Sequence, residues 1–279
     1  MRADKLLWVL AGTLFLSVVA YGQGAVGGGS SSTAASVPRT PDGKPDLTGR
    51  WNGEAGQITH TNILEEHGGG FGIRAGKSLI IDPPDGIIPY QPWALAERNR
   101  RRLDSSAYMD QVGHCEFRGI ARVHTGAQEF MYAGNSIIHT AGNMTRVIDM
   151  DRREHLPESI RLWLGDPIGR WEGDRLVVDS TNFNGRTQMA IGGDFYSADA
   201  HIVERYTLVD ANTMNWTMTF NDPKVFTRPW TMTTGVPMAR QRVPVDDFNG
   251  EDDCHEGNTD LLHLKNVYDQ ARKANPQLK

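Results

Sequence analysis

The stretch HIVERYTLVDANTMNWTMTF, residues 201–220, decides the fold of this protein. Apolar and polar residues alternate on both sides of residues 210–213, a short segment rich in turn-forming types. Because successive side chains of a strand point to opposite faces, this alternation predicts two strands, His201–Val209 and Met214–Phe220, joined as a hairpin. The chain should therefore be built mainly from antiparallel strands.

The same period of two recurs elsewhere. Residues Arg175–Phe183 follow a turn at Glu172-Gly173-Asp174, with Pro167–Trp171 as the incoming arm of a second hairpin. Other alternating segments are Ser78–Ile81, Glu129–Tyr132, Ile137–Thr140, Met144–Asp149 and the residues Trp230, Met232 and Thr234. Many short strands with close turns predict a mainly β protein, and we favour an antiparallel β-barrel, lipocalin-like or related, because closure removes edges and leaves a cavity. A β-sandwich is the alternative.

Helical periodicity is confined to two segments. Residues Gln91–Leu103 predict a mostly polar helix whose four arginines, Arg98, Arg100, Arg101 and Arg102, should form a solvated face. Residues 259–275 repeat apolar side chains at intervals of three and four and stop before Pro276. They predict a C-terminal helix whose apolar stripe packs on the main body.

The N-terminus reads as an export signal. Arg2 and Lys5 precede the apolar run Leu6–Ala20, which is shorter than the roughly 20 residues of a bilayer span, so residues 1–22 predict a cleavable signal peptide. An uncleaved anchor is the alternative. Residues 23–44 are a flexible Gly/Ser-rich linker, and 45–279 form a single β-rich domain with long N-terminal loops. We expect a periplasmic or secreted bacterial protein with no stable membrane insertion after cleavage.

Composition and missing motifs narrow the function. Of 279 residues 39% are hydrophobic, an ordinary globular balance, and 34 acidic against 29 basic side chains give a net charge of −5. That balance argues against a nucleic acid partner. The sequence contains no GxSxG or P-loop motif and no HxH, HExxH or CxxC spacing, and its GxGxxG match, residues 22–27, lies in the Gly-rich linker region, so the sequence predicts neither a cofactor nor a metal. It leaves the oligomeric state open.

The two cysteines, Cys115 and Cys254, suggest a disulfide in an exported protein. The bond would close a loop of about 140 residues, worth on the order of 5 kcal/mol in the chain-entropy model. A buried free thiol is the alternative. A disulfide would also fix His255 and Glu256, which follow Cys254 directly.

Glu204 is the polar residue in the most unusual position. On the strand 201–209 it shares a face with Tyr206, and the apolar face of the partner strand carries Trp216. Apolar faces pair across a hairpin, so Glu204 should point into the protein interior. A carboxylate there must find a cation or hydrogen bonds, or take up a proton. It is therefore a site candidate, with a structural ion pair to an arginine as the alternative.

Several longer motifs resemble a family of secreted bacterial proteins of no settled activity. The matching stretches are TPDGKPDLTGRW (40–51), IIDPPDGIIPYQPWA (80–94), the Cys115 segment, WLGDPIGRWEGDRLVVDSTNF (163–183), HIVERYTLVDANT (201–213), NDPKVFTRPWT (221–231) and CHEGN (254–258). PDLTGRW is also similar to the Gly-x-Trp start of lipocalin-type barrels. The resemblance implies functional positions at Asp166, Trp171, Glu172, Asp174, Glu204, Asp222, His255 and Glu256. The chain departs from the family at Pro167, where Ser is usual, and at Tyr196-Ser197, in place of His-Ser.

Two functions from different classes follow. The first is binding of a small, partly apolar ligand in an internal cavity of the barrel. Its ligand contacts would come from Tyr206, Trp216, Trp171, Asp179, Trp230 and Glu256. The second is a cofactor-independent lyase, isomerase or hydrolase in which Glu204 acts as general acid or base with His201 or His255 as its partner. A structural protein of the cell envelope is a third possibility.

Overall fold

The computed structural model describes residues 36–52, 64–68, 75–103, 117, 119–123, 127–141, 144–190, 192–233, 237–241 and 273. All of them belong to one compact unit of the chain, residues 34–279. The predicted signal peptide lies outside the described residues, and so do Cys115, Cys254, His255 and Glu256. The predicted C-terminal helix also lies outside them, except for Lys273, which is helical.

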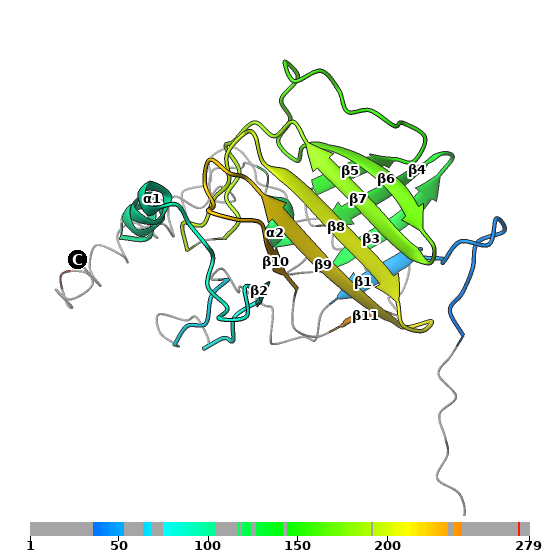
Figure 1. Cartoon of the computed structure of the whole chain (residues 1–279). Helices are drawn as coiled ribbons and strands as arrows, with labels where there is room; N and C mark the ends of the chain where they lie inside the picture. The colour runs from blue at the N-terminus through cyan, green and yellow to red at the C-terminus, as the bar shows by residue number, and fades with distance from the viewer. Residues whose placement is uncertain are drawn as a thin grey trace, which may run out of the picture. The chain divides into compact units, whose positions relative to one another are not determined.

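The described residues form eleven strands and two helices (Figure 1). In chain order these are β1 (Gly49–Asn52), β2 (Ile80–Asp82), α1 (Pro92–Leu103), α2 (Ile120–Val123), β3 (Gln128–Ala133), β4 (Ser136–Ala141), β5 (Met144–Asp149), β6 (Asp166–Glu172), β7 (Arg175–Thr181), β8 (His201–Leu208), β9 (Thr213–Asn221), β10 (Trp230–Met232) and β11 (Met238–Arg240).

The strands close into a barrel. β9 pairs with β8 along its length, with β11 through its first residues and with β10 through its last. Because β11 also pairs with β1, nine strands form a ring in the order β1-β3-β4-β5-β6-β7-β8-β9-β11. β10 and β2 branch from β9 as a short extension. The protein is therefore a β-barrel and not a sandwich.

The barrel is mixed, so the prediction of a wholly antiparallel barrel is wrong at one junction. β5 and β6 run parallel and share a single residue pair, Asp149 with Ile168. Parallel neighbours need a long connection, which residues 150–165 provide as an extended loop above these strands in Figure 1. The junction is also tight on one side, because a Cβ on Gly169 would lie 2.2 Å from Sδ of Met150.

The β8–β9 hairpin has the register that the alternation predicts. Tyr206 lies opposite Trp216 and Glu204 opposite Met218, and all four side chains are buried. Tyr206, Trp216 and Met218 belong to a single large cluster of aromatic and aliphatic side chains that fills the interior. Alternate positions along β8 are partly exposed, so one face of the hairpin forms the inside of the barrel wall.

Helix α1 begins one residue later than expected, at Pro92, which is a favoured first helical residue. The prediction that its four arginines form a solvated face is wrong for Arg98, which is buried and forms an ion pair of 3.0 Å with Glu65. No helix in the described part of the chain is both long and apolar enough to cross a membrane.

Candidate functional site

A buried ion pair occupies the inside of the barrel. Arg146 Nη1 lies 2.9 Å from Oε1 of Glu204 and Nη2 lies 2.6 Å from Oε2, a bidentate arrangement. The side chains are 2% and 0% exposed. Tyr206 donates its hydroxyl to Oε1 of the same carboxylate at 2.6 Å, and Arg146 Nη2 also reaches the hydroxyl of Ser180 at 3.3 Å.

Both partners reach the interior through strand alternation. Glu204 shares the inner face of β8 with Tyr206, and Arg146 shares the inner face of β5 with Met144 and Ile148. Burial by itself lowers the pKa of Arg146, but the charge of Glu204 and the hydrogen bonds to it outweigh burial and raise that pKa. Burial, reinforced by the charge of Glu204, raises the pKa of Tyr206 well above its usual value. The guanidinium and the phenol therefore stay protonated at neutral pH.

Polar groups continue beside this pair. His139 Nε2 lies 2.8 Å from Oε1 of Gln128, and the imidazole stacks on Phe130 with ring centroids 4.3 Å apart. Phe130 packs edge-on against Tyr206 at 5.2 Å. The interior thus combines a fixed polar network with a dense aromatic core, which holds the side chains of the pair in one arrangement.

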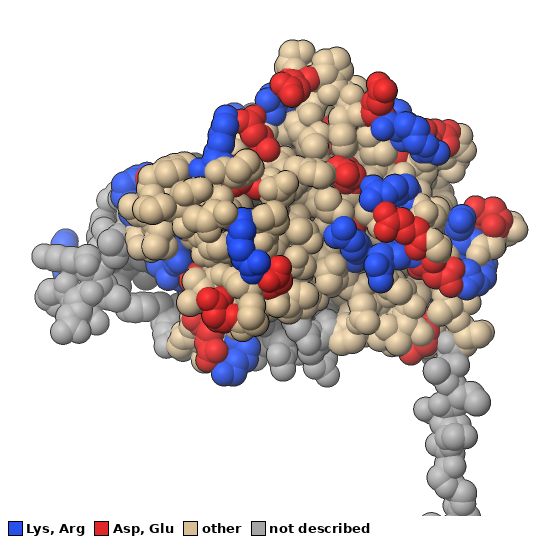
Figure 2. All heavy atoms as spheres, viewed as in Figure 1, with Lys and Arg blue, Asp and Glu red and all other residues tan. Residues whose placement is uncertain are grey.

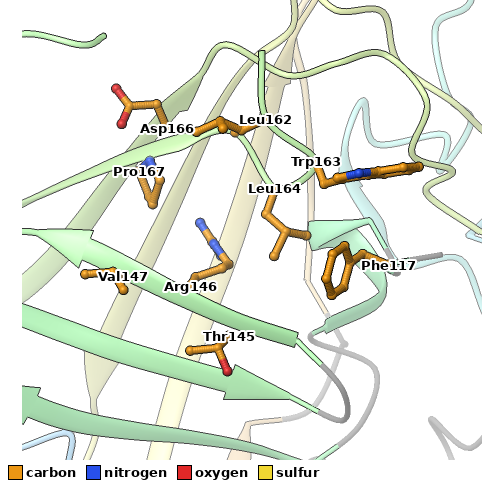
Figure 3. Close-up of a pocket in the computed structure, with 10 residues that line it drawn as sticks. Phe117, Thr145, Arg146, Val147, Leu162, Trp163, Leu164, Asp166 and Pro167 are labelled. Atoms are coloured by element: carbon orange, nitrogen blue, oxygen red, sulfur yellow. The ribbon is translucent and has the colours of Figure 1, made fainter. Parts of the chain in front are cut away.

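The barrel wall opens at the parallel junction. Since β5 and β6 pair through one residue only, they separate toward their N-terminal ends, and a pocket of about 490 Å³ lies there. Its lining comes from β5, from the connection before β6, from the first two residues of β6 and from Phe117 (Figure 3). The lining residues are Phe117, Thr145, Arg146, Val147, Leu162, Trp163, Leu164, Gly165, Asp166 and Pro167.

Most of the pocket is apolar. Phe117, Val147 and Leu162 are 40%, 55% and 38% exposed, unusually high for large apolar side chains. Trp163 and Phe117 form an aromatic corner with ring centroids 6.3 Å apart and an interplanar angle of 69°. Exposed apolar side chains that converge on one concave place are typical of a ligand site rather than of ordinary surface.

Arg146 lies at the floor of this pocket. Figure 3 shows its side chain rising from β5 toward the space bounded by Leu164 and Pro167. Its Nη atoms bind Glu204 and Ser180, whereas its buried Nε has no hydrogen-bond partner among the described residues. An unpaired buried N–H costs about 1–3 kcal/mol. A residue of the pocket lining therefore has an unused N–H donor, which a ligand oxygen that reached it could satisfy.

A second polar cluster lies on the outer face of the wall beside the pocket. The carboxylate of Asp166 binds both terminal nitrogens of Arg152, at 3.1 and 2.6 Å. His155 bridges Asp166 and Asp179 through its two ring nitrogens, at 3.1 and 3.2 Å, and Asp179 also accepts from Nε2 of His201 at 2.7 Å. These contacts fix the 150–165 connection to β6 and β7, and they join β7 to β8 through Asp179 and His201.

The pKa values in this cluster respond to the same contacts. Burial raises the pKa of Asp179, but hydrogen bonds and charge from His201 and His155 outweigh it, and the net shift is downward. The hydrogen bond to Asp179 raises the pKa of His201, against a smaller opposing effect of burial. Among the described residues, no group of three or more His, Cys, Asp or Glu side chains is arranged to hold a metal ion.

The structure separates some residues that the sequence grouped. Glu204 points into the barrel and His201 lies on the outer face of the same strand, so the two are on opposite sides of the wall. Tyr206, Trp216 and Trp230 are packed in the core, with Trp230 stacked on Phe220 at 4.4 Å. Asp179 and Trp171 are only partly buried.

Positions implied by the resemblance are spread over the barrel. Glu172 pairs with Arg170 at 2.8 Å on the surface, and Asp174 pairs with Arg39 at 2.6 Å at the β6–β7 turn. Asp222 is buried and accepts from the backbone N–H and the hydroxyl of Ser197. These three carboxylates have structural partners and do not converge on the pocket.

Sequence reasoning did not single out Arg146. The signal was present, because Arg146 alternates with Met144 and Ile148 in a predicted strand and therefore shares their buried face. Trp163 could not have been selected in this way, since it lies in the irregular connection before β6. Comparisons with protein-family models, with curated proteins and with solved structures found no match to the chain.

Proposed function

We propose that this protein is an exported β-barrel that binds a small, partly apolar ligand, and that the ligand enters the pocket between β5 and β6. The observation that carries the proposal is the buried Nε–H of Arg146, without a hydrogen-bond partner among the described residues, at the floor of a mostly apolar pocket. The ligand would thus lie in the barrel wall rather than at the centre of the barrel. The expected lipocalin-like relationship is part of the same proposal, since such barrels hold one small ligand.

The charges around the pocket favour an uncharged polar end on the ligand. Glu204 neutralises Arg146 through two hydrogen bonds, and Arg152 does the same for Asp166. A charged ligand would bring an unmatched charge into a largely apolar site, where desolvation is costly. A carbonyl, amide or hydroxyl oxygen could accept from Nε of Arg146 without that cost, while a flat body packs in the aromatic corner of Phe117 and Trp163.

Catalysis by Glu204 has less support from this geometry. Both oxygens of Glu204 accept hydrogen bonds from Arg146, and Oε1 accepts a further one from Tyr206. A carboxylate held in this way positions a guanidinium and lacks the access that a general base needs to a substrate proton.

A calorimetric titration with 2-naphthamide, an uncharged aromatic amide, tests the proposed function. We expect saturable binding to the wild type, and at least tenfold weaker binding to Val147→Trp, because the new indole would fill the pocket from its outer wall. Val209→Trp is the matched control, since Val209 is similarly exposed, at 51% against 55% for Val147, and lies outside the pocket lining.

A second variant examines the donor itself. Arg146→Lys keeps a positive charge beside Glu204 but has no Nε–H, so it should weaken binding of 2-naphthamide while the thermal unfolding transition remains cooperative. Equal affinity of the amide for wild type and Val147→Trp would rule out this pocket as the binding site. Release of naphthoate from the amide would instead identify an enzyme.

A further inference from the structure

A second pocket lies on another side of the molecule, between α1 and two loop segments. Its volume is about 790 Å³, and it is lined by one face of the helix and by residues 184–185 and 195–198. The helix contributes Trp93, Ala96, Glu97, Arg100 and Arg101. Their spacing of three and four residues places them along a single stripe of the helix. Nothing in this pocket belongs to the site between β5 and β6.

The walls of this pocket are held rigidly. Arg98 anchors α1 through Glu65 at 3.0 Å and lies 3.8 Å from Asp194. Gly193 has a φ of +87°, and a Cβ there would lie 2.9 Å from the carbonyl oxygen of Arg98, so the loop packs directly on the helix backbone. On the opposite side, Asp222 fixes Ser197 through two hydrogen bonds.

The pocket carries a net positive charge. Glu97 accepts hydrogen bonds from Arg100 and Arg101, each at 2.8 Å, and these contacts lower the pKa of Glu97 to about 2. One carboxylate therefore faces two guanidinium groups. Within the described residues, the side chain of Arg101 forms a hydrogen bond only through Nε, which leaves its terminal nitrogens available.

Aromatic rings orient the same cation. The guanidinium of Arg101 lies over the Phe195 ring, 4.1 Å from its centroid, a cation–π contact that restrains its position. Beside them, Trp93 is 55% exposed although its indole N–H is fixed by the carbonyl oxygen of Lys224 at 3.1 Å. An exposed but immobilised indole next to an oriented guanidinium offers a flat platform and an anion-binding edge together.

We propose that this pocket binds a small organic carboxylate, whose carboxyl group pairs with the terminal nitrogens of Arg101 and whose flat body lies against Trp93. A single guanidinium edge matches the two oxygens of a carboxylate. The neighbouring carboxylate of Glu97 disfavours a doubly charged group such as phosphate, because one net positive charge is available. This second site is independent of the proposed function of the β5–β6 pocket.

Calorimetric titration with 2-naphthoate tests this inference, with 2-naphthamide as the uncharged probe of the same shape. We expect Arg101→Gln to weaken 2-naphthoate at least tenfold. Arg102→Gln removes the same charge from the same helical turn outside the pocket lining and should leave the affinity within twofold of wild type. Trp93→Leu, a change of an exposed side chain, should also weaken 2-naphthoate.

The two pockets are distinguishable in the same experiment. Val147→Trp should weaken binding of 2-naphthamide at least tenfold and leave 2-naphthoate unaffected, whereas Arg101→Gln should weaken 2-naphthoate at least tenfold and leave 2-naphthamide unaffected. If Arg101→Gln and Arg102→Gln change the affinity for 2-naphthoate equally, or if Trp93→Leu leaves it unchanged, the carboxylate site is wrong. Should Arg101→Gln fail to fold, Arg101→Lys, which keeps the charge and loses the paired donors, replaces it and should weaken binding.

Discussion

At the scale of single residues, the ion pair of Arg146 and Glu204 is the contact on which the barrel interior most depends. Each side chain is almost completely buried, and each would be left as an uncompensated charge if the other were removed. Such a loss is much larger than that of a surface pair, because water does not replace the missing partner.

Glu204→Gln should therefore destabilise the protein by about 3–5 kcal/mol, measured by urea unfolding at pH 7. The surface variant Glu172→Gln, which loses a pair at 47–48% exposure, should cost less than about 1 kcal/mol. The double variant Arg146→Met/Glu204→Met should lose less stability than the sum of the losses in Arg146→Met and Glu204→Met alone, since the double variant leaves neither charge without its partner. Unfolding of Glu204→Gln at the urea concentration of wild type would show that the pair contributes little.

At the scale of elements, the 150–165 connection shapes the β5–β6 pocket, and its attachment depends on titratable groups. Asp166 lines the pocket and is bound by Arg152 and His155, while His201 and Arg170 face Asp179 at 2.7 and 3.8 Å. A contact between a histidine and a carboxylate is strongest where the histidine is protonated and the carboxylate is ionised, which limits it to a range of pH.

The direction of each pKa shift determines the pH range in which these contacts stabilise the protein. The pKa of His201 is raised from 6.5, so its contribution is complete below about pH 6.5 and is lost as the pH rises through the raised value. The pKa values of Asp166 and Asp179 are lowered from 3.8, so the contribution of these two carboxylates to stability is complete above about pH 3.8 and is lost as the pH falls through the lowered values. The cluster is therefore most stabilising between these limits.

We expect the free energy of unfolding to fall between pH 6 and 9 by less than about 1 kcal/mol through this cluster, because His201 is 42% exposed. His201→Gln should flatten this part of the pH profile. In an NMR titration Asp179→Asn should lower the pKa of His201, whereas Asp210→Asn, at a hairpin turn, should leave it unchanged. A His201 pKa that does not respond to Asp179→Asn would remove the basis for this pH dependence.

At the scale of the whole molecule, barrel closure depends on short strands from the two ends of the described domain. Arg240 on β11 donates hydrogen bonds to the carbonyl oxygens of Asp46, Thr48 and Ala211, and its guanidinium lies 4.2 Å from the ring centroid of Trp51 on β1. One side chain thus connects β11 with β1 and with the β8–β9 turn. Basic and acidic side chains are mixed over the face of the molecule shown in Figure 2, so repulsion between like charges does not oppose barrel closure on that face.

Arg240→Met should destabilise the protein by about 2–4 kcal/mol in urea unfolding, from the loss of charged hydrogen bonds and a cation–π contact. Arg228→Gln, which breaks an exposed pair of 2.6 Å with Asp82, should cost less than about 1 kcal/mol. Equal effects of the two variants would mean that Arg240 does not hold the barrel closed.

Much of this architecture can be predicted from the local alternation of apolar and polar residues. The hairpin at 201–220, the strand 144–149 and the inward position of Glu204 all follow from a period of two, because side-chain direction in a strand depends only on position along it. The same reasoning missed β1 and β11, because their sequences, GRWN and MAR, bury one side chain each and show no alternation of apolar and polar residues.

The sequence by itself determined a mainly β protein, most of its strands, and a carboxylate facing the interior. Only the tertiary structure decided that the ring closes through β11, that β5 and β6 run parallel, and that Arg146 is the partner of Glu204. The physical reason is the separation of the interacting residues along the chain. Alternation depends on neighbouring residues, whereas these features join residues that are far apart in the sequence; Arg146 and Glu204 are 58 positions apart. Strand pairing across such distances depends on the packing of the whole core, and the β5–β6 pocket exists only because one of those pairings is incomplete.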